Sequence, residues 1–445
     1  GGHAHTVLCN AGCKTLPLYR CPNISFEGDS VYTNLPVAGA FRGYGAPQAY
    51  FALESCMDEL ARRLDVCPVE LRKKTTIRSG ESSPIWEVLG EGKQGIKQVL
   101  GSCGLEECIE SGARLIGWNK RSELTRTGRF RQGMGMSTHL EGSSVPEVDM
   151  ASASIKMNED GSFNLAMGAT DLGQGSDTVL AQVAAEVLGV QIDDIIVRSS
   201  DTDLTPFDVG AYASSTTYLS GNAVKNAAQK VRRQILAVAA RELERPFEML
   251  ALKDKKVIST DGTELPLHRI GAISLYEDEQ FQIASFGSAI SHSSPPPFGA
   301  QFALVEVDVL TGFVKVLHYV ATVDCGRAIN PKLAKGQMHG AVAQGLGYAL
   351  TEEMCFDDKG RLTNGNFSEY PVYRMIDMPR VSVVLVDTVE ESGPFGAKSI
   401  GEVGLCGALP TIGNAIFDAT GVRLQRAPFT PERVLAALRA ADVKA

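Results

Sequence analysis

The sequence predicts an α+β protein with at least two domains. The chain has 445 residues, more than a single hydrophobic core usually organises. Its 44% hydrophobic and 21% charged residues are typical of a soluble globular protein. Segments with helical spacing of apolar residues alternate with paired segments in which apolar and polar residues alternate, as in β-hairpins. A composition shift at 128–133 predicts the boundary between a first domain, 1–127, and a second, 128–445.

The first domain is expected to begin with the end of a sheet, because residues 1–40 mix short β-prone runs with turn signals. Pro47 suits the first turn of a helix whose apolar positions keep helical spacing. A second short helix is expected at 68–72. The segment 77–131 is polar and rich in Gly and Ser, with one helical stretch at 104–115, and is interpreted as a connecting segment.

The second domain is predicted to combine hairpins with helices. Asn158-Glu-Asp-Gly161 joins two alternating segments, 151–157 and 163–167, in a hairpin. Ser176 is the expected N-cap of the following helix, and Gly189 lies beyond its end. The other expected elements are a strand at 195–198, a helix at 223–243, a hairpin of 300–309 with 313–323, a helix at 332–352, a strand at 381–386 and a helix at 408–419.

Charge and composition argue against several classes of partner. The net charge of −9, with no block of Lys or Arg, argues against nucleic acid or an anionic membrane surface. No apolar run approaches the about 18 residues of a membrane-spanning helix. The ten cysteines are scattered, without a C-x-x-C pair or a Cys/His cluster at zinc spacing. We therefore expect reduced thiols and a cytoplasmic protein.

The first residues, Gly1-Gly-His-Ala-His5, contain neither an initiator Met nor a signal-peptide pattern. We expect further sequence to precede them. Whether the chain is a natural subunit or a fragment of a longer polypeptide stays open.

Four glycine loops precede expected helices, at 42–46, 173–176, 210–221 and 393–407. Each alone is ordinarily a tight turn or a solvated connection. Glycine also lets the backbone approach a ligand, and helix N-termini offer N–H donors. Because four such loops carry Arg and Tyr, Gln, Ser and Thr, or Glu, they predict one extended polar ligand on which they converge. None has the spacing of a Walker loop.

Five motifs, in order, resemble the molybdenum hydroxylases, the family of xanthine dehydrogenase and aldehyde oxidoreductase. They are Thr33-Asn-Leu-Pro-Val-Ala-Gly-Ala-Phe-Arg-Gly-Tyr-Gly-Ala-Pro-Gln48, Gly173-Gln-Gly175, the loop around Ser214, Gly336-Gln-Met-His-Gly-Ala-Val-Ala-Gln-Gly345 and Gly393-Pro-Phe-Gly-Ala-Lys-Ser-Ile-Gly-Glu402. The match corresponds to the later part of the family's molybdopterin-binding large subunit. It implies two elongated mixed α/β domains of that subunit type: 1–127 is the C-terminal part of the first domain plus a connecting segment, and 128–445 is the second. The first domain is thus incomplete at its N-terminus, because the family's Gly-Gly-Phe-Gly-type motif has no counterpart.

The resemblance also implies roles for individual residues. Glu402 matches the family's glutamate beside the metal, the general base of hydroxylation, and Tyr44 matches a position where it would stack on a planar substrate. No metal ligand is assigned in this chain. The residues implied to bind the cofactor are Arg42, Gly43, Gln174, Gly175, Ala213, Ser214, Gln337, Gln344 and Lys398.

The implied cofactor is Mo-molybdopterin, expected in its cytosine dinucleotide form. The implied partners are the remainder of the subunit, a small-molecule substrate, and [2Fe–2S] and FAD groups on partner chains or missing segments. This chain lacks ferredoxin cysteine spacing and a nucleotide fingerprint that could hold these groups itself.

An N-heteroaromatic substrate of purine or nicotinate type is expected. Arg42, where some aldehyde-specific members of the family carry an uncharged residue, favours a heteroaromatic or carboxylated substrate. An arginine that xanthine-specific members carry is absent around 9–13, and Val403-Gly404 replaces a usual proline-containing continuation. An aldehyde oxidoreductase, a hydroxybenzoyl-CoA reductase-like enzyme and a non-catalytic scaffold subunit stay open as alternatives. His139 and Glu141 could line the pocket, but we expect surface positions for both.

Overall fold

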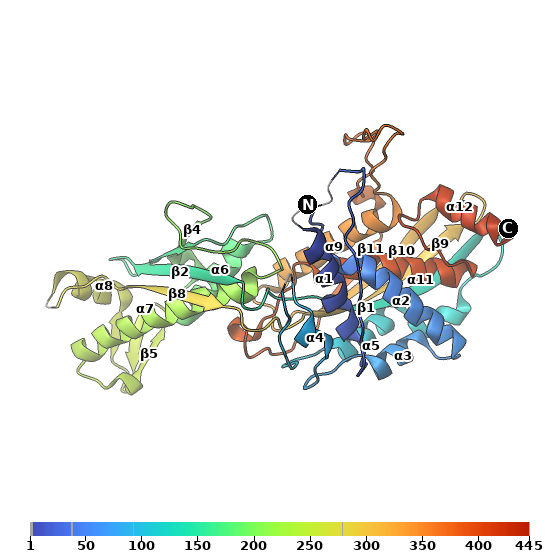
Figure 1. Cartoon of the computed structure of the whole chain (residues 1–445). Coiled ribbons are helices and arrows are strands. Elements are labelled where there is room, and N and C mark those ends of the chain that lie inside the picture. Colours follow the sequence, from blue (N-terminus) through green and yellow to red (C-terminus); the bar gives the residue numbers. More distant parts are fainter. Residues whose placement is uncertain (1–2, 37–38, 92, 278, 445) are drawn as a thin grey trace.

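The chain folds into two lobes that lie side by side and give an elongated molecule (Figure 1). The computed structural model describes residues 3–36, 39–91, 93–277 and 279–444. The larger lobe is built on a four-stranded sheet of order β1-β9-β10-β11, and the smaller on a sheet of order β4-β3-β2-β8. A third sheet, β5-β6-β7, belongs to the smaller lobe. These mixed layers confirm the predicted α+β class.

The sheet of the larger lobe is buried on both faces. Its strands are β1 (Phe130–Leu140), β9 (Phe298–Asp308), β10 (Val314–Asp324) and β11 (Arg380–Leu385), antiparallel except for the parallel pair β10 and β11. Ala303, Val305 and Val307 of β9 pack in one hydrophobic cluster with α9 (Pro331–Leu350) and α11 (Ala408–Thr420). Phe298 and Phe302 face the opposite cluster, with α5 (Leu105–Ile116). The alternation predicted for this hairpin is therefore confirmed.

The smaller lobe covers one face of its sheet with two helices. The strands are β2 (Met150–Met157), β3 (Phe163–Met167), β4 (Ile195–Ser199) and β8 (Ala284–Ile290). Alternate residues of β2 pack in one cluster with α6 (Ser176–Leu188) and α7 (Gly221–Glu242). The predicted hairpin and both helices are confirmed, except that Gly175 with φ 85° is the N-cap in place of Ser176. The remaining elements of this lobe are β5 (Leu250–Lys253), β6 (Lys256–Ser259), β7 (Glu264–Pro266) and α8 (Leu267–Tyr276).

The other helices belong to the larger lobe. They are α1 (Ala4–Thr15), α2 (Ala46–Arg63), α3 (Pro68–Thr75), α4 (Ile85–Val88), α10 (Val403–Cys406) and α12 (Pro431–Ala440). The helices predicted after Pro47 and at 68–72 are confirmed. Within the described residues, none of these helices, or those of the smaller lobe, is both long and apolar enough to cross a bilayer.

The sheet end expected at residues 1–40 is wrong, because its first part is helix α1. The helix packs on α2. A Cβ on Gly45 would lie 2.2 Å from the carbonyl oxygen of Val7, so only glycine allows this approach. The packing on α2, rather than local propensity, therefore selects helix for this segment.

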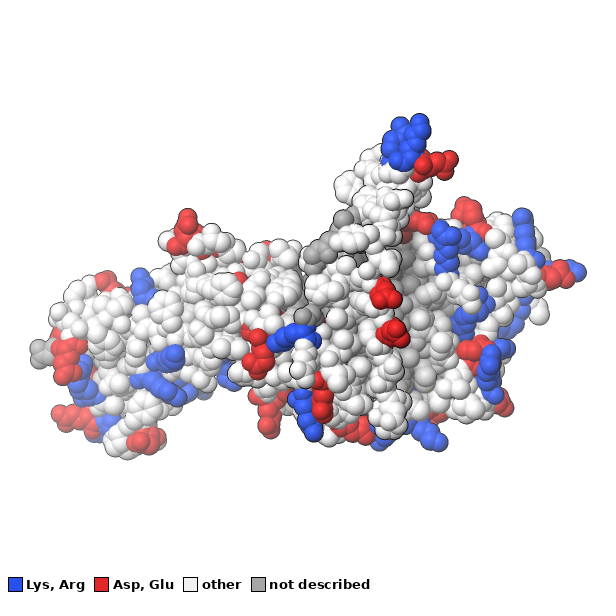
Figure 2. Space-filling model, viewed as in Figure 1, with Lys and Arg blue, Asp and Glu red and all other residues white. Residues whose placement is uncertain are grey.

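The predicted boundary at 127/128 stays a prediction, and the packing groups the chain differently. β1 follows this boundary, yet α5 from the preceding segment covers the sheet that β1 edges. The smaller lobe is formed by residues from about β2 to β8 and is inserted between β1 and β9 of the larger one. Lys, Arg, Asp and Glu are interspersed on the face drawn in Figure 2, which shows no extended basic patch.

Candidate functional site

A cavity of about 920 Å³ is lined by both lobes. The larger lobe contributes one side of α1, the 40–44 loop, the start of α9 and the 397–402 loop. The smaller lobe contributes the 172–174 loop and the 211–217 loop. The four glycine loops that the sequence singled out thus reach one cavity, which is large enough for an extended ligand.

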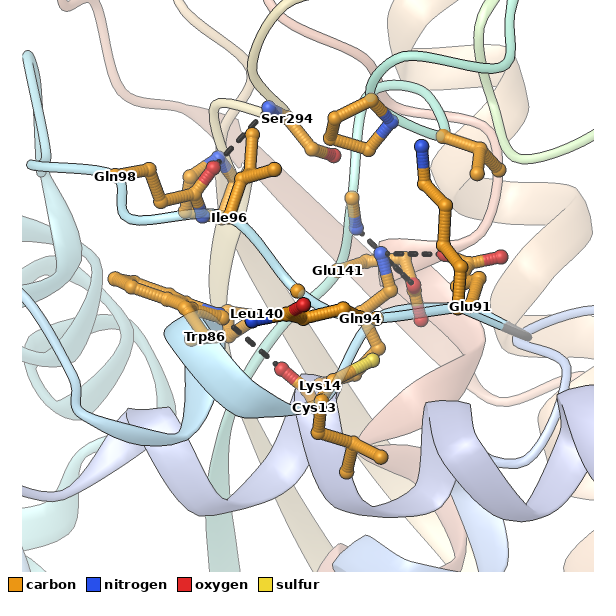
Figure 3. A pocket seen from close by; sticks show the side chains of 18 residues that line it. Cys13, Lys14, Trp86, Glu91, Gln94, Ile96, Gln98, Leu140, Glu141 and Ser294 are labelled. Atoms are coloured by element: carbon orange, nitrogen blue, oxygen red, sulfur yellow. Dashed lines mark hydrogen bonds and ion pairs between the residues drawn. The ribbon is translucent and has the colours of Figure 1, made fainter.

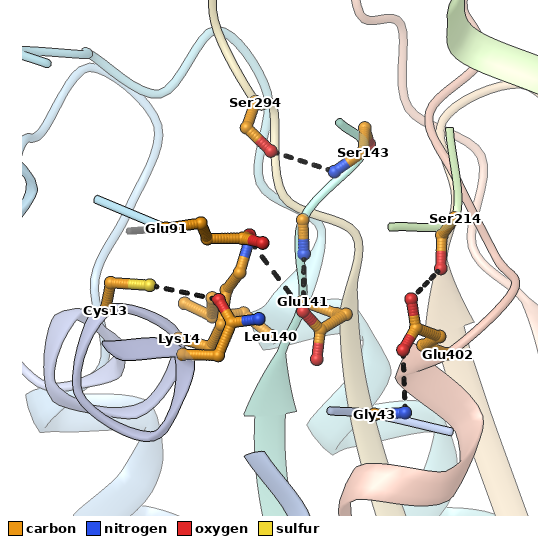
Figure 4. Close-up of polar contacts among 12 residues, drawn as sticks. Cys13, Lys14, Gly43, Glu91, Leu140, Glu141, Ser143, Ser214, Ser294 and Glu402 are labelled. Atoms are coloured by element: carbon orange, nitrogen blue, oxygen red, sulfur yellow. Dashed lines mark hydrogen bonds and ion pairs between the residues drawn. The ribbon is translucent and has the colours of Figure 1, made fainter. Parts of the chain in front are cut away.

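Glu402 precedes the short helix α10 and is anchored through both carboxylate oxygens. The backbone N–H of Gly43 donates to Oε2 at 2.7 Å, and the hydroxyl of Ser214 donates to Oε1 at 3.0 Å (Figure 4). A Cβ on Gly401 would lie 2.9 Å from the Ser214 Oγ, so glycine allows the two loops to approach. Three loops distant in sequence therefore orient one carboxylate in the cavity.

Arg42 connects the 40–44 loop to the Glu402 loop and to α9. Its Nε donates to the carbonyl of Gly401 at 2.5 Å, and its Nη2 donates to the Gln337 Oε1 at 3.1 Å. Burial lowers the pKa of Arg42, against the opposing effect of Glu402. Arg42 and Gln337 both line the cavity and hold each other in place.

Tyr44 lies in the same loop with φ 39°, between Gly43 and Gly45, which also have positive φ. Its hydroxyl is hydrogen-bonded to the Nδ1 of His3, and the two rings meet edge to face with centroids 5.6 Å apart. Burial raises the pKa of this phenol. Tyr44 lines the cavity, and its stacking on a substrate stays a prediction.

The Gly173-Gln-Gly175 loop satisfies many of its polar groups internally. The Gln174 side chain donates to the carbonyl of Thr170 at 2.8 Å and accepts from the N–H of Leu172 at 2.5 Å. The N–H of Gly175 donates to the carboxylate of Asp171 at 3.2 Å. Gln174 lines the cavity, whereas Gly175 is not among its described lining residues.

Ala213 and Ser214 both have left-handed backbone, with φ of 49° and 57°. Both line the cavity. Neither backbone N–H donates to a partner among the described residues. This loop therefore offers two free amide donors beside the Glu402 carboxylate.

Lys398 and Gln344 differ from the other predicted cofactor-binding residues. The Nζ of Lys398 donates to the Asp324 Oδ2 at 2.6 Å, and both side chains are 0% exposed. Lys398 lines the cavity with its charge already paired. Gln344 lies two turns after Gln337 on α9 and is not among the described lining residues.

Sequence reasoning missed a whole wall of the cavity. His3, Thr6, Asn10 and Lys14, spaced along one side of α1, line it together with Glu91 and Glu141. The first four of these polar residues are spaced by three and four positions, which is typical of one side of a helix. The expectation of a sheet end rested instead on the short β-prone runs of this segment. The surface positions expected for Glu141 and His139 are wrong, because they are 5% and 0% exposed.

Comparison with known families identifies the class of protein. The molybdopterin cofactor-binding domain matches in its two forms, one over residues 1–76 and the other over residues 111–379. The chain therefore belongs to the molybdenum hydroxylase family, in its molybdopterin-binding large subunit. Among the described residues, no group of three or more His, Cys, Asp or Glu is arranged to hold a metal ion.

Individual relatives agree with this family. The probable hypoxanthine oxidase XdhD of Escherichia coli (strain K12) is 37% identical over 98% of this chain and 46% of its own length. The putative xanthine dehydrogenase molybdenum-binding subunit XdhA of the same organism is 35% identical over 97% of this chain and 57% of its own length. The crystal structure of quinoline 2-oxidoreductase from Pseudomonas putida 86 superposes with a TM-score of 0.87 and 25% identity, covering 98% of this chain and 57% of that one. The chain thus spans about half the length of the relatives it matches.

The cavity fits a molybdopterin cofactor by the chemistry of its donors. Such a group is extended, planar in part and anionic at its phosphates, so it needs room and hydrogen-bond donors. The cavity supplies about 920 Å³, the free N–H groups of Ala213 and Ser214, and the Arg42 guanidinium. Gly173 adds open space, because nothing lies within 4 Å of a Cβ placed there.

Proposed function

We propose that this chain is the catalytic part of a hydroxylase that inserts a water-derived oxygen at an electron-poor carbon of an N-heteroaromatic compound. The observation that carries the proposal is the position of Glu402. Its carboxylate is anchored through both oxygens and lines the large cavity of this chain. A carboxylate held in this way can accept a proton without first reorganising.

Mo-molybdopterin, proposed in the cytosine dinucleotide form, would supply the oxygen-transfer and redox chemistry. The residues that would hold it are Arg42, Ala213, Ser214 and Gln337, with Gln174 at the smaller lobe. Gly43, Gln344, Gly175 and Lys398 stay as predicted contacts, although the N–H of Gly43 already donates to Glu402 and Lys398 is already paired with Asp324.

The chain's own residues would divide the work as follows. The Gly43 N–H and the Ser214 hydroxyl fix the two oxygens of Glu402, so that the remaining lone pairs can accept a proton from the attacking oxygen. Arg42 holds the carbonyl of Gly401 and so fixes the loop that carries Glu402. Tyr44 would place its ring against the flat face of the substrate.

The substrate class is inferred from the cavity and from the relatives. The names of the three relatives refer to hypoxanthine, xanthine and quinoline, all N-heteroaromatic compounds. The volume of the cavity and the presence of Tyr44 and Arg42 in its lining support a purine or a nicotinate-type ring. An aldehyde substrate, an aryl-CoA substrate and a non-catalytic scaffold role are the alternatives.

Electrons would leave through [2Fe–2S] and FAD groups on partner chains or on segments outside this sequence, which would also complete the cofactor site. We propose a cytoplasmic complex with these partners and the remainder of the large subunit. We propose neither nucleic acid nor a membrane as a partner.

The test of the base is Glu402→Gln in the purified complex, because Gln keeps the shape and removes the proton acceptor. We expect turnover to fall by about two to four orders of magnitude with molybdenum and pterin content unchanged. Ser214→Ala is the matched control: it removes one hydrogen bond to the same carboxylate and should cost only about tenfold. Near wild-type turnover of the Gln variant with cofactor bound would exclude this role for Glu402.

A substrate panel tests the reaction class. Xanthine, hypoxanthine, nicotinate, aromatic aldehydes and aryl-CoA thioesters are offered to the complex with an artificial electron acceptor. Hydroxylation of a heteroaromatic ring is expected to be fastest. A complex that contains neither molybdenum nor pterin would instead favour the scaffold alternative.

A further inference from the structure

Three ionisable side chains form a buried group in the cavity wall beside Glu402. Lys14 comes from α1, Glu91 from the segment after α4, and Glu141 directly follows β1 (Figure 4). The Lys14 Nζ lies 3.0 Å from the Glu91 Oε1 and 3.8 Å from the Glu141 Oε1, with side-chain exposures of 10%, 9% and 7%. The function proposed above uses none of these three residues.

Glu141 is the member closest to the Glu402 loop. Its Oε1 accepts from the N–H of Gly142 at 3.0 Å, and its Oε2 lies 3.4 Å from the Sγ of Cys406. The same sulfur lies 3.7 Å from the backbone oxygen of Glu402. Glu141 and Glu402 both line the large cavity, and the charge of Glu402 acts on Glu141, so a ring held between them meets both carboxyl groups.

A substrate ring can approach the buried group of Lys14, Glu91 and Glu141 from one side only. Behind it lies a second hollow of about 50 Å³, lined by Trp86, Leu89 and Ile96 (Figure 3). That volume is far below the about 300 Å³ at which ligand pockets begin. A ligand that meets Glu141 must therefore lie in the large cavity, on the side of Glu402.

The group has little capacity for a further negative charge. Glu91 already takes the short contact to Lys14, and Glu141 lies only at 3.8 Å from it. A ligand carboxylate placed beside Glu141 would face the carboxyl groups of Glu91, Glu141 and Glu402, and a buried charge without a partner is costly. A neutral ligand avoids this cost.

We propose that Glu141 is a specificity-determining residue whose carboxyl group donates a hydrogen bond to a neutral acceptor atom, a ring nitrogen or a ring carbonyl, of the heteroaromatic substrate. This inference rests on the proposed function and narrows it from heteroaromatic rings in general to uncharged ones. Lys14 and Glu91 position the carboxyl group from behind.

The protonation of Glu141 agrees with this role. Burial, opposed by Lys14 and reinforced by Glu402, raises the pKa of Glu141 to about 8, so the neutral acid predominates at pH 7. Burial alone would lower the pKa of Lys14, but Glu91 and its neighbours outweigh that effect and raise it, so Lys14 stays charged. The ionisable groups that face Glu141 are Lys14 and Cys13 of α1, Glu91, Tyr50 of α2, Cys406 of α10 and Glu402.

Two probes of nearly equal shape test the proposal by equilibrium binding to the purified complex. Quinoline has one ring nitrogen that accepts a hydrogen bond and is uncharged at neutral and alkaline pH, whereas naphthalene has no acceptor. We expect the wild-type complex to bind quinoline about tenfold more tightly than naphthalene at pH 7. We expect this preference to disappear as the pH rises through about 8, the pKa of Glu141.

Two substitutions of Glu141 distinguish the effect of its hydrogen-bond donor from the effect of its size and shape. Glu141→Gln keeps a neutral donor, so the preference for quinoline should persist at pH 7 and become independent of pH. Glu141→Leu removes the donor and should abolish the preference, leaving naphthalene binding unchanged. The infrared band of the protonated Glu141 carboxyl group should be present in the wild type at pH 7, lose about half of its intensity near pH 8 and be absent from Glu141→Gln.

The outcomes also distinguish this inference from the proposed function. Equal binding of the two probes by the wild type, a preference kept by Glu141→Leu, or a preference independent of pH in the wild type would overturn the inference. A complex that shows the expected preferences but hydroxylates no heteroaromatic ring would instead overturn the proposed function.

Discussion

Two buried lysine–carboxylate groups each contribute a lysine to the lining of the same cavity, and they differ in how completely their hydrogen bonds are satisfied. Lys398 pairs with Asp324 at 2.6 Å, with both side chains 0% exposed. Lys14 contacts Glu91 at 3.0 Å and Glu141 at 3.8 Å, and all three keep some exposure to the cavity. We call the first group closed, because it is fully buried, and the second open, because it keeps exposure to the cavity.

The closed group holds segments of the larger lobe together. Besides Lys398, Asp324 accepts from the N–H of Gly104 at 2.8 Å, the N–H of Gly326 at 2.9 Å and the Thr388 hydroxyl at 2.6 Å. Four donors satisfy one carboxylate, as burial of a charge requires. The pair therefore fixes the end of β10 against the 393–407 loop, and its carboxylate needs no hydrogen bond from a ligand.

The open group leaves a carboxyl group with less compensation. Glu141 has one backbone donor, a thiol contact and a distant ammonium. Its neutral form is correspondingly favoured, as the raised pKa of Glu141 shows. The comparison teaches that a buried ionisable side chain in a cavity wall indicates ligand binding only where its hydrogen bonds within the protein are incomplete.

The largest effect that tests this comparison is on stability. Lys398→Met leaves Asp324 buried without its cation and should lower the free energy of unfolding by about 3 kcal/mol. Lys14→Met should lower it by only about 1 kcal/mol, because Glu141 is already neutral and Glu91 is near the cavity. Urea unfolding of the purified complex measures both values. Equal losses in the two variants would contradict the distinction between a closed and an open group.

The next effect is the pH dependence of stability, in which Glu141 and His139 act in opposite directions. The pKa of Glu141 is raised from 4.5 to about 8, so its contribution to stability falls as the pH rises from about 4.5 to about 8. Burial lowers the pKa of His139 from 6.5 to about 3, so its contribution falls as the pH drops from about 6.5 to about 3. Neither ring nitrogen of His139 has a partner among the described residues.

Melting temperatures of the complex between pH 4 and pH 9 check both contributions. Glu141→Gln should flatten the loss on the alkaline side, and His139→Leu should flatten the loss on the acid side, each relative to the wild type. One proton contributes at most about 1.4 kcal/mol per pH unit. If either variant follows the wild-type curve throughout, that group titrates in the folded protein as it does in the unfolded chain.

The fold was predictable where a pattern is local and repeated. Ala303, Val305 and Val307 alternate along β9 because one side of the strand is buried under α9 and α11. Gly189 ends α6 with φ 60°, which glycine adopts without strain. Helix α1 offered only one such local signal, the spacing of its polar residues, and it also packs closely against Gly45, which is distant in sequence.

The candidate site was predictable to the extent that glycine loops carry it. Arg42, Gln174, Ser214 and Glu402 lie on such loops, and the structure brings all four to one cavity. Glu141 could be named only as a possible lining residue with an expected surface position, because it follows an ordinary strand and its contacts come from α1 and α10. Residues whose surroundings come from distant segments need the fold before their chemistry can be read.

The smallest expected effect is that of a substitution at Gly142, which should move the Lys14 ammonium group without removing its charge. A Cβ on Gly142 would lie 2.2 Å from the Lys14 Nζ and 2.8 Å from the Ser294 Oγ. Gly142→Ala should therefore displace the end of a flexible side chain and weaken its support of Glu141. We expect KM for a heteroaromatic substrate to rise about threefold, with kcat nearly unchanged.

The matched control is Gly336→Ala on α9, at a position where nothing lies within 4 Å of the added Cβ. Alanine is the better helix former there, so this variant should be slightly more stable and keep the wild-type KM. Steady-state kinetics of both variants over a pH series complete the test. Because the support of Glu141 matters only while its carboxyl group is protonated, the difference in KM between Gly142→Ala and the wild type should shrink above pH 8. A difference that stays constant with pH would mean that Gly142 acts on the shape of the cavity and not through Glu141.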